Sequence, residues 1–274
     1  MSKDEHPALE LRGLRKVFGK FAAVDGIDLR VERGQVFGFL GPNGAGKTTT
    51  LRLITGLLDP TAGEIRVCGV DAIKTPLEAK RRIGFISDRP YLYDKLTGAE
   101  FLRFVGGLWG MSKDDITARG ERWLERFDLS GWSGEPVESY SHGMRQRLLL
   151  CSALLHEPEL MIMDEPMVGL DPRGAARLKD VIRELAGAGI AVVLSTHTLD
   201  VVEQVCDALA IINRGVIVAE GTLEEVKRQH GQRGRLEELF LHVTEGQRNP
   251  DDPSSAGPKA AAADDGDDGD EAAA

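Results

Sequence analysis

Two segments of the 274-residue chain combine residue types suited to phosphate chemistry. The first runs from Gly41 to Thr48 and fits the pattern G-x-x-x-x-G-K-[ST], which is typical of a phosphate-binding P-loop. Glycines let backbone N–H groups turn toward phosphate oxygens, and the helix that follows adds positive potential. We expect Lys47 to reach the β- and γ-phosphates and the Thr48 hydroxyl to bind Mg²⁺. The alternative, a turn that merely joins a strand to a helix, is disfavoured by the complete pattern.

The second segment is an apolar run, Leu160–Met163, that ends in two adjacent carboxylates, Asp164 and Glu165. A buried strand has little reason to end in paired acids unless they meet a cation or a reacting water. Asp164 is predicted to hold Mg²⁺ through its water shell, and Glu165 to orient or deprotonate the attacking water. A solvated strand end is the alternative reading for the pair, and the P-loop makes it less favourable.

A histidine follows another apolar run, Ile190–Leu194, at position 197. A lone histidine after a strand is more often structural than catalytic. His197 nevertheless falls at the carboxyl ends of the predicted strands, where α/β proteins bind ligands, so it joins Glu165 and Lys47 as a catalytic candidate. No N-K-x-D motif for guanine occurs in the sequence, which favours ATP over GTP.

These residues require parallel strands and helices to position them. A buried strand is predicted at Val36–Leu40 and a helix from Lys47 to Gly56. The other predicted strands are Ile83–Ile86, Leu160–Met163, Ile190–Leu194, Ala208–Asn213 and Val216–Ala219. The stretch between the second and third strands carries mainly helical periodicity, so the fold class is α/β, a P-loop core with an inserted helical subdomain.

Composition excludes several classes of protein. The net charge of −10 argues against nucleic acid as the main partner. Three widely spaced cysteines do not form a disulfide framework or a cysteine-based zinc site. No apolar run reaches the roughly 18 residues of a membrane span, and the first residues lack a signal region. We therefore expect a soluble, intracellular chain. Residues 247–274 contain two basic and eight acidic residues and no branched or aromatic apolar side chain, which predicts a disordered acidic tail.

The chain resembles the ATP-binding subunit of an ABC transporter from Leu9 to about Thr244. The order of motifs carries the resemblance: a P-loop, a helical insertion, a signature segment at Ser141–Met144, the paired acids and the histidine. Ser141–Met144 has His and Met where the family usually has glycine and glutamine, as in the exporter-type subgroup that pairs with ABC-2 permeases. Leu96–Glu100 and Leu236–Leu241 are similar to that subgroup too, and Gly169–Asp171 matches the family's D-loop.

The resemblance implies ATP and Mg²⁺ as cofactors and ATP hydrolysis coupled to transport as the activity. It places an adenine-stacking aromatic ring at Phe18, for which a packed core phenylalanine is the alternative. The predicted nucleotide-binding residues are Phe18, Gly41, Pro42, Asn43, Gly44, Ala45, Gly46, Lys47, Thr48, Thr49, Ser141 and Gly143. Residues 1–246 are predicted to form the ATPase domain, with core 1–88 and 156–246 and helical subdomain 89–155.

The implied partners are a separately encoded membrane permease and a second ATPase subunit, either an identical copy or a close paralogue, docked head to tail. Each ATP then lies between one P-loop and the other subunit's Ser141. The implied location is cytoplasmic, at the inner face of the membrane through the permease. The segment Arg89–Tyr93 is a candidate contact with the permease, and inner packing of the helical subdomain is the alternative.

One position departs from the family pattern. Asp88 stands where a glutamine that contacts the metal is expected after Ile83–Ser87. Aspartate either reaches Mg²⁺ through a water or only caps the loop.

Two other functions are alternatives to transport. A soluble ABC ATPase that regulates a ribosome, DNA repair or signalling usually has two cassettes or a long coiled coil, and a P-loop kinase leaves the signature, Glu165 and His197 unexplained.

Overall fold

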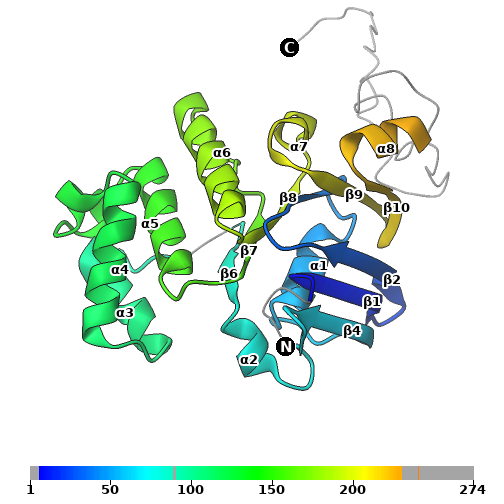
Figure 1. The fold of residues 1–274 in the computed structure, drawn as a ribbon, viewed down its shortest axis with the longest axis horizontal. Coiled ribbons are helices and arrows are strands. Elements are labelled where there is room, and N and C mark those ends of the chain that lie inside the picture. Colours follow the sequence, from blue (N-terminus) through cyan, green and yellow to red (C-terminus); the bar gives the residue numbers. More distant parts are fainter. Residues whose placement is uncertain (1–5, 89–90, 230–239, 241–274) are drawn as a thin grey trace, which may run out of the picture.

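The computed structural model describes residues 6–88, 91–229 and 240, which form two β-sheets and a set of helices (Figure 1). The smaller sheet is antiparallel, and its strands are β1 (Leu9–Phe18), β2 (Phe21–Val31), β4 (Ala62–Val67) and β5 (Val70–Asp71), in the order β2-β1-β4-β5. The larger sheet contains β3 (Val36–Leu40), β6 (Ile83–Ile86), β7 (Leu160–Asp164), β8 (Ala191–Thr196), β9 (Ala208–Asn213) and β10 (Val216–Gly221). Its order is β10-β9-β3-β8-β7-β6, and β10 is antiparallel to its neighbour whereas the other pairs are parallel.

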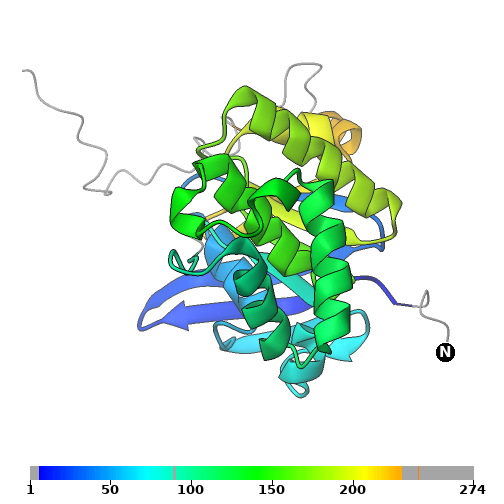
Figure 2. The same cartoon turned by 90° about the vertical axis from the view of Figure 1, so that its left-hand side faces the viewer.

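The helices divide between the sheets and a separate group. Those that accompany the sheets are α1 (Lys47–Ile54), α2 (Pro76–Lys80), α6 (Pro172–Gly187), α7 (Leu199–Val205) and α8 (Leu223–Gln229). The group, drawn in green in Figures 1 and 2, contains α3 (Gly98–Leu108), α4 (Lys113–Arg126), α5 (His142–Leu154) and the 3₁₀ turns η1 (Ser130–Trp132) and η2 (Val137–Ser139). Helical periodicity predicted helices in this stretch, and side chains of Thr97, Ser112 and Ser141 cap their N-termini.

Both faces of the large sheet are covered, which explains its continuous apolar strands. Every residue of β3, β7, β8 and β9 is buried. Side chains alternate between faces. Met161 and Met163 pack with the helices of the green group and α6, whereas Leu160 and Ile162 pack with the antiparallel sheet and α1. Such two-sided burial is the usual setting of a parallel sheet.

The strands predicted from apolar runs are present. β3, β6 and β9 have the predicted bounds, while β7, β8 and β10 extend slightly further at their C-terminal ends and β8 begins one residue later than predicted, at Ala191. The predicted helix from Lys47 to Gly56 ends earlier, at Ile54, because Gly56 has a φ of 65° and leaves the helical region.

The antiparallel sheet has no counterpart among the strands predicted from the sequence. β1 buries only one face, and register shifts between β1 and β2 after Leu11, Leu14 and Lys16 interrupt the alternation of apolar and polar residues. Such bulges hide the period of two that a strand normally shows. The omission matters because Phe18 lies at the end of β1.

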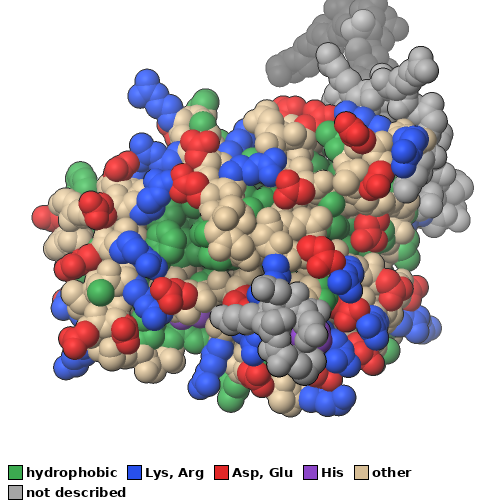
Figure 3. Space-filling model, in the orientation of Figure 1, with side chains coloured by type: hydrophobic (Ala, Val, Ile, Leu, Met, Phe, Trp, Pro, Cys, Tyr) green, Lys and Arg blue, Asp and Glu red, His purple; other side chains and the backbone are tan. Residues whose placement is uncertain are grey.

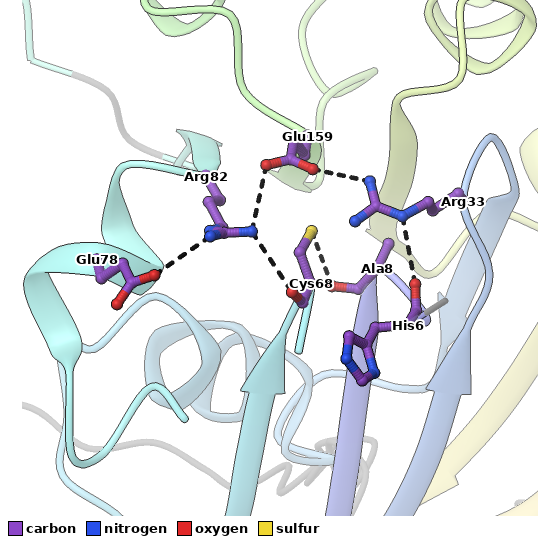
Figure 4. A network of polar contacts seen from close by, with 7 residues as sticks. All are labelled: His6, Ala8, Arg33, Cys68, Glu78, Arg82 and Glu159. Carbon is purple, nitrogen blue, oxygen red and sulfur yellow. Dashed lines mark hydrogen bonds and ion pairs between the residues drawn. The ribbon is translucent and has the colours of Figure 1, made fainter. Parts of the chain in front are cut away.

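A network of partly buried charges joins the two sheets at the end of the molecule near β4 (Figure 4). The Glu159 carboxylate, just before β7, accepts hydrogen bonds from Arg33 at 2.8 Å and from Arg82 at 3.5 Å. Arg33 follows β2 and donates to the carbonyl of His6, and Arg82 precedes β6 and donates to the carbonyl of Cys68. Because each charge has a partner, the network fixes the antiparallel sheet on the core without an unpaired buried ion.

A second junction joins the green helices to the large sheet. The His156 ring stacks on Trp109 at the end of α3, with centroids 4.1 Å apart, and its Nε2–H donates to the carbonyl of Ile83 in β6 at 3.0 Å. Nδ1 is buried and has no hydrogen-bond partner among the described residues. Burial therefore lowers the pKa of His156, and the positive charge of Arg119 lowers it further.

The predicted acidic tail, residues 247–274, lies outside the described residues, as does the stretch Leu236–Leu241 except for Phe240. None of the described helices has the length and apolar character needed to cross a bilayer. The three cysteines are free thiols, as their spacing predicted.

We predict that acid weakens the fold through His156. A histidine whose pKa is lowered in the folded state stays neutral there while the unfolded chain takes up a proton, so its contribution is present above about pH 6.5 and is lost as the pH falls below that value. Urea unfolding at pH 7.5 and 5.5 should show the wild type losing more stability than His156→Gln, which keeps a donor for Ile83. Equal losses in both proteins would contradict this role.

Candidate functional site

The loop between β3 and α1 approaches other backbone segments so closely that glycine is required. A Cβ atom on Gly41 would lie 2.4 Å from the carbonyl oxygen of Ile212 in β9. A Cβ atom on Gly46 would lie 2.6 Å from the Ala23 carbonyl oxygen, and Gly46 also has a φ of 112°. The loop therefore packs against β2 and β9 in one conformation, which leads directly into the N-terminus of α1.

Lys47 begins α1 and is 6% exposed. Its ammonium donates to the carbonyl oxygens of Gly41 at 2.7 Å and Pro42 at 3.2 Å, and it lies 3.5 Å from Oε1 of Glu165. The side chain thus curls back over the loop, and its positive charge is held at the same place as the free N–H groups of the helix N-terminus. Such a place attracts an anion.

The two carboxylates lie at the end of β7, where Ser195 of β8 contacts the Asp164 carboxylate and the Glu165 backbone. Asp164 is 2% exposed and pairs in register with Ser195. The Ser195 hydroxyl donates to Oδ1 of Asp164 and accepts a hydrogen bond from the backbone N–H of Glu165 at 3.0 Å. Glu165 has a φ of 50°, a left-handed conformation that turns the chain sharply after the strand.

This turn places the Glu165 side chain between two basic groups. Its Oε1 faces Lys47, and its Oε2 lies 3.0 Å from Nδ1 of His197, which follows β8. The carboxylate side chain is 16% exposed and that of His197 is 51% exposed. A carboxylate held in this way beside an anion site can accept a proton from a water molecule that reaches the cavity.

A cavity of about 450 Å³ brings most of the predicted nucleotide-binding residues together. It is lined by the hairpin residues Phe18, Phe21 and Ala23, by the loop and helix residues Pro42, Asn43, Gly44, Ala45, Gly46, Lys47, Thr48 and Thr49, and by Asp88 and Glu165. We call it the P-loop cavity. The Gly41 carbonyl accepts a hydrogen bond from the Lys47 ammonium. Asp164 lines a neighbouring depression of about 230 Å³ with Asp88 and Glu165.

Two predicted residues lie elsewhere. Ser141 and Gly143, at the N-terminus of α5, line a different cavity, of about 520 Å³, together with Gly169 and Asp171. Hydrophobic surface is visible in this region, over α5 and α6, in Figure 3. The Ser141 hydroxyl accepts a hydrogen bond from the Met144 N–H at 3.3 Å, as expected of an N-cap. Within the described part of one chain, Ser141 does not reach the P-loop cavity.

Two site residues are visible only in the structure. Ser195 depends on the register between β7 and β8, which are 26 residues apart in the sequence. Phe21 depends on the β1–β2 hairpin, which its interrupted alternation conceals. The only local signal for Ser195 is a serine at the end of an apolar run. The local signal for Phe21 is the pair of aromatic residues that flanks Gly19.

The chain is similar to known proteins in sequence and in structure. The family model described as ABC transporter matches residues 24–168. A daunorubicin resistance ATP-binding protein of Streptomyces coeruleorubidus is 42% identical over 224 residues, which cover 82% of this chain and 71% of that protein. A Nod factor export ATP-binding protein of Cupriavidus metallidurans is 38% identical over 80% of this chain and 72% of its own length. A solved structure of an ATP-binding subunit of an ABC transporter has a TM-score of 0.79 and 33% identity over 86% of this chain and 99% of that chain.

We predict that Ser195→Ala slows ATP hydrolysis about 10- to 100-fold, because Ser195 orients Asp164, the predicted Mg²⁺ ligand, and residues that orient metal ligands affect activity on this scale. ATP binding measured by calorimetry should change little, because Ser195 does not line the P-loop cavity. Ser152→Ala, which removes a buried hydroxyl in α5, is the matched control and should retain the wild-type rate. A Ser195→Ala protein with the wild-type rate would show that the carboxylates do not need this hydroxyl.

Proposed function

The chain belongs to the ABC transporter family, and we propose from its site how it binds and hydrolyses ATP to power a separate membrane permease. The observation that carries the proposal is the buried Lys47 ammonium facing the Glu165 carboxylate across 3.5 Å beside the P-loop cavity. One group attracts phosphate and the other accepts a proton, which are the two requirements for hydrolysing a phosphoanhydride with water.

The P-loop holds the triphosphate. The incoming phosphate oxygens compete with the carbonyls of Gly41 and Pro42 for the Lys47 ammonium, and they exchange a neutral acceptor for a charged one. Backbone N–H groups of the loop and of the first turn of α1 donate to the same oxygens. At the other side of the cavity, Phe18 stacks on the adenine ring.

The oxygen donors near Lys47 fit Mg²⁺. This ion prefers oxygen ligands, retains several waters and shares its coordination with substrate phosphates. The Thr48 hydroxyl lines the P-loop cavity. The Asp164 carboxylate lines the neighbouring depression, and one of its oxygens accepts a hydrogen bond from Ser195. No group of three or more metal-binding side chains occurs among the described residues, as suits an ion held largely by the nucleotide. Mg²⁺ would supply positive charge to the β- and γ-phosphates, and Asp88, which lines the same cavity, would either reach it through a water or only cap its loop.

Glu165 acts as the general base. Its two oxygens are oriented by Lys47 and His197. His197 is half exposed, and from this place it can contact both Glu165 and the γ-phosphate. The oxygen of the attacking water forms a bond to the γ-phosphorus as its proton passes to the Glu165 carboxylate, and the bond between the γ-phosphorus and the bridging oxygen breaks, which releases ADP and inorganic phosphate.

A second ATPase subunit, identical or closely related, completes the site from outside. Ser141 and Gly143 form a helix N-terminus that lines a cavity other than the P-loop cavity of the same chain. A helix N-terminus with a hydroxyl suits a phosphate, and a head-to-tail partner can bring one to it. In this arrangement each ATP lies between the P-loop of one subunit and Ser141 of the other.

The permease is expected to bind near the segment Arg89–Tyr93. Arg89 and Pro90 lie outside the described residues, and the described part of the segment carries exposed aromatic side chains: Tyr91 contacts Tyr93, and Tyr93 contacts Phe104 of α3, with ring centroids 5.4 and 5.1 Å apart. Aromatic residues are enriched at the centres of interfaces.

Relatives named for resistance and export support an exporter of the ABC-2 type, with the chain at the inner membrane face. We assign residues 1–88 and 156–246 to the core and 89–155 to the helical subdomain that carries this contact.

We predict that Glu165→Gln lowers ATP turnover at least about 100-fold, because the amide cannot accept the proton. Binding of ATP should persist, since the substitution keeps the size of the side chain and removes a negative charge near the γ-phosphate. Size-exclusion chromatography with ATP should show a larger fraction of dimer than for the wild type.

The control for this experiment is Glu184→Gln, which removes an exposed carboxylate on α6 outside the P-loop cavity. It should hydrolyse ATP and elute as the wild type does. Undiminished hydrolysis by Glu165→Gln would remove Glu165 from the role of base.

A further inference from the structure

The tip of the β1–β2 hairpin presents two aromatic rings to the P-loop cavity. Phe18 ends β1, Phe21 begins β2, and their Cα atoms are directly paired across a two-residue turn, Gly19 and Lys20. Directly paired residues project from the same face of a sheet. Phe18 is 47% exposed and Phe21 is 64% exposed, so neither ring is held by a packed core.

A ring that is half exposed has rotational freedom, and a ligand that stacks on it must restrict that freedom. One neighbour already restricts Phe18. The Lys16 ammonium lies over the Phe18 ring, 5.1 Å from its centroid, which is the geometry of a cation–π contact. Lys16 precedes Phe18 by two residues on the same strand.

Lys16 is itself held in place. Its ammonium donates to the carbonyl oxygen of Asp59 at 2.6 Å, in the connection between α1 and β4. The backbone nearby is tied to β1 as well, because Thr61 donates its N–H to the Arg15 carbonyl at 2.8 Å and its hydroxyl accepts from the Val17 N–H at 3.0 Å. The cation over the ring is therefore anchored to a fixed segment.

The positions of the two side chains relative to the cavity differ. Phe18 lines the P-loop cavity, and Lys16 is absent from the described residues that line it. Lys16 therefore contacts the Phe18 ring without being among the described residues that line the cavity.

We propose that Lys16 is a positioning residue for the nucleotide base: it fixes the Phe18 ring so that one face is presented to the base. This inference rests on the proposed binding of ATP in the P-loop cavity. Among the described residues, the Lys16 ammonium contacts the Asp59 carbonyl and the Phe18 ring, so its contribution is confined to ligands that carry a base. The alternative is that Lys16 only fastens β1 to the Asp59 segment.

The test compares a ligand with a base and a ligand without one. Calorimetry measures the binding of Mg-ADP and of Mg-tripolyphosphate to the wild type, Lys16→Met, Lys16→Arg and Phe18→Ala. Lys16→Met removes the cation and keeps the length of the side chain, and it should weaken ADP binding about two- to fivefold, the range of an exposed cation–π contact. Lys16→Arg retains a cation and should restore ADP binding. Tripolyphosphate should bind all four proteins equally.

Lys20→Met, in the hairpin turn, is the matched control for loss of a lysine and should bind ADP as the wild type does. Unchanged ADP binding by Lys16→Met, while Phe18→Ala is weakened, would overturn the role of Lys16 and leave the nucleotide site intact. Equal weakening of ADP and tripolyphosphate by Lys16→Met would also overturn it, because a loosened strand affects both ligands. A wild type that binds neither ligand would overturn the proposed function together with this inference.

Discussion

The burial of the Lys47 ammonium is the constraint on which the rest of the site depends. A charge that is 6% exposed is costly to remove from water unless other groups surround it with opposite charge or dipoles. The carbonyls of Gly41 and Pro42 and the carboxylate of Glu165 do so here. None of these partners is bound to Lys47 covalently, so a phosphate can replace them. A loop with larger residues at Gly41 or Gly46 could not curl tightly enough to offer its carbonyls.

The fold supplies the partners from strands that are distant in sequence. β3 ends in the loop, β7 ends in Asp164 and Glu165, and β8 lies between them in the sheet and ends near His197. Because these strands are parallel, their carboxyl ends meet at one edge, which is where ligands bind in open α/β sheets. The register between Asp164 and Ser195 then sets the turn that directs Glu165 toward Lys47. The catalytic geometry is thus a consequence of strand order and register.

The sequence predicted those parts whose signals are local. Gly41–Thr48 is a contiguous pattern, and the strand β3 before it is an unbroken apolar run because both its faces are buried. Ser195 was beyond reach because its role depends on pairing between two strands, and Lys16 because its contacts with Phe18 and Asp59 require the hairpin to be placed. The antiparallel sheet was missed for a related reason: its bulges break the alternation that marks a half-buried strand. The role proposed for Ser141, which lies outside the P-loop cavity of its own chain, rests on the family resemblance and not on spacing.

A substitution at Lys47 can separate the stability of the chain from its affinity for ATP. Lys47→Met removes the buried charge, keeps an unbranched apolar side chain and leaves the Glu165 carboxylate with His197 as its partner, so the unliganded protein should still unfold in one cooperative transition with a measurable melting temperature. Mg-ATP should raise the melting temperature of the wild type, because a ligand that binds only the folded state stabilises it, and it should leave that of Lys47→Met unchanged. Thermal unfolding of both proteins with and without Mg-ATP measures this directly. An equal rise in both proteins would contradict the claim that Lys47 holds the phosphates.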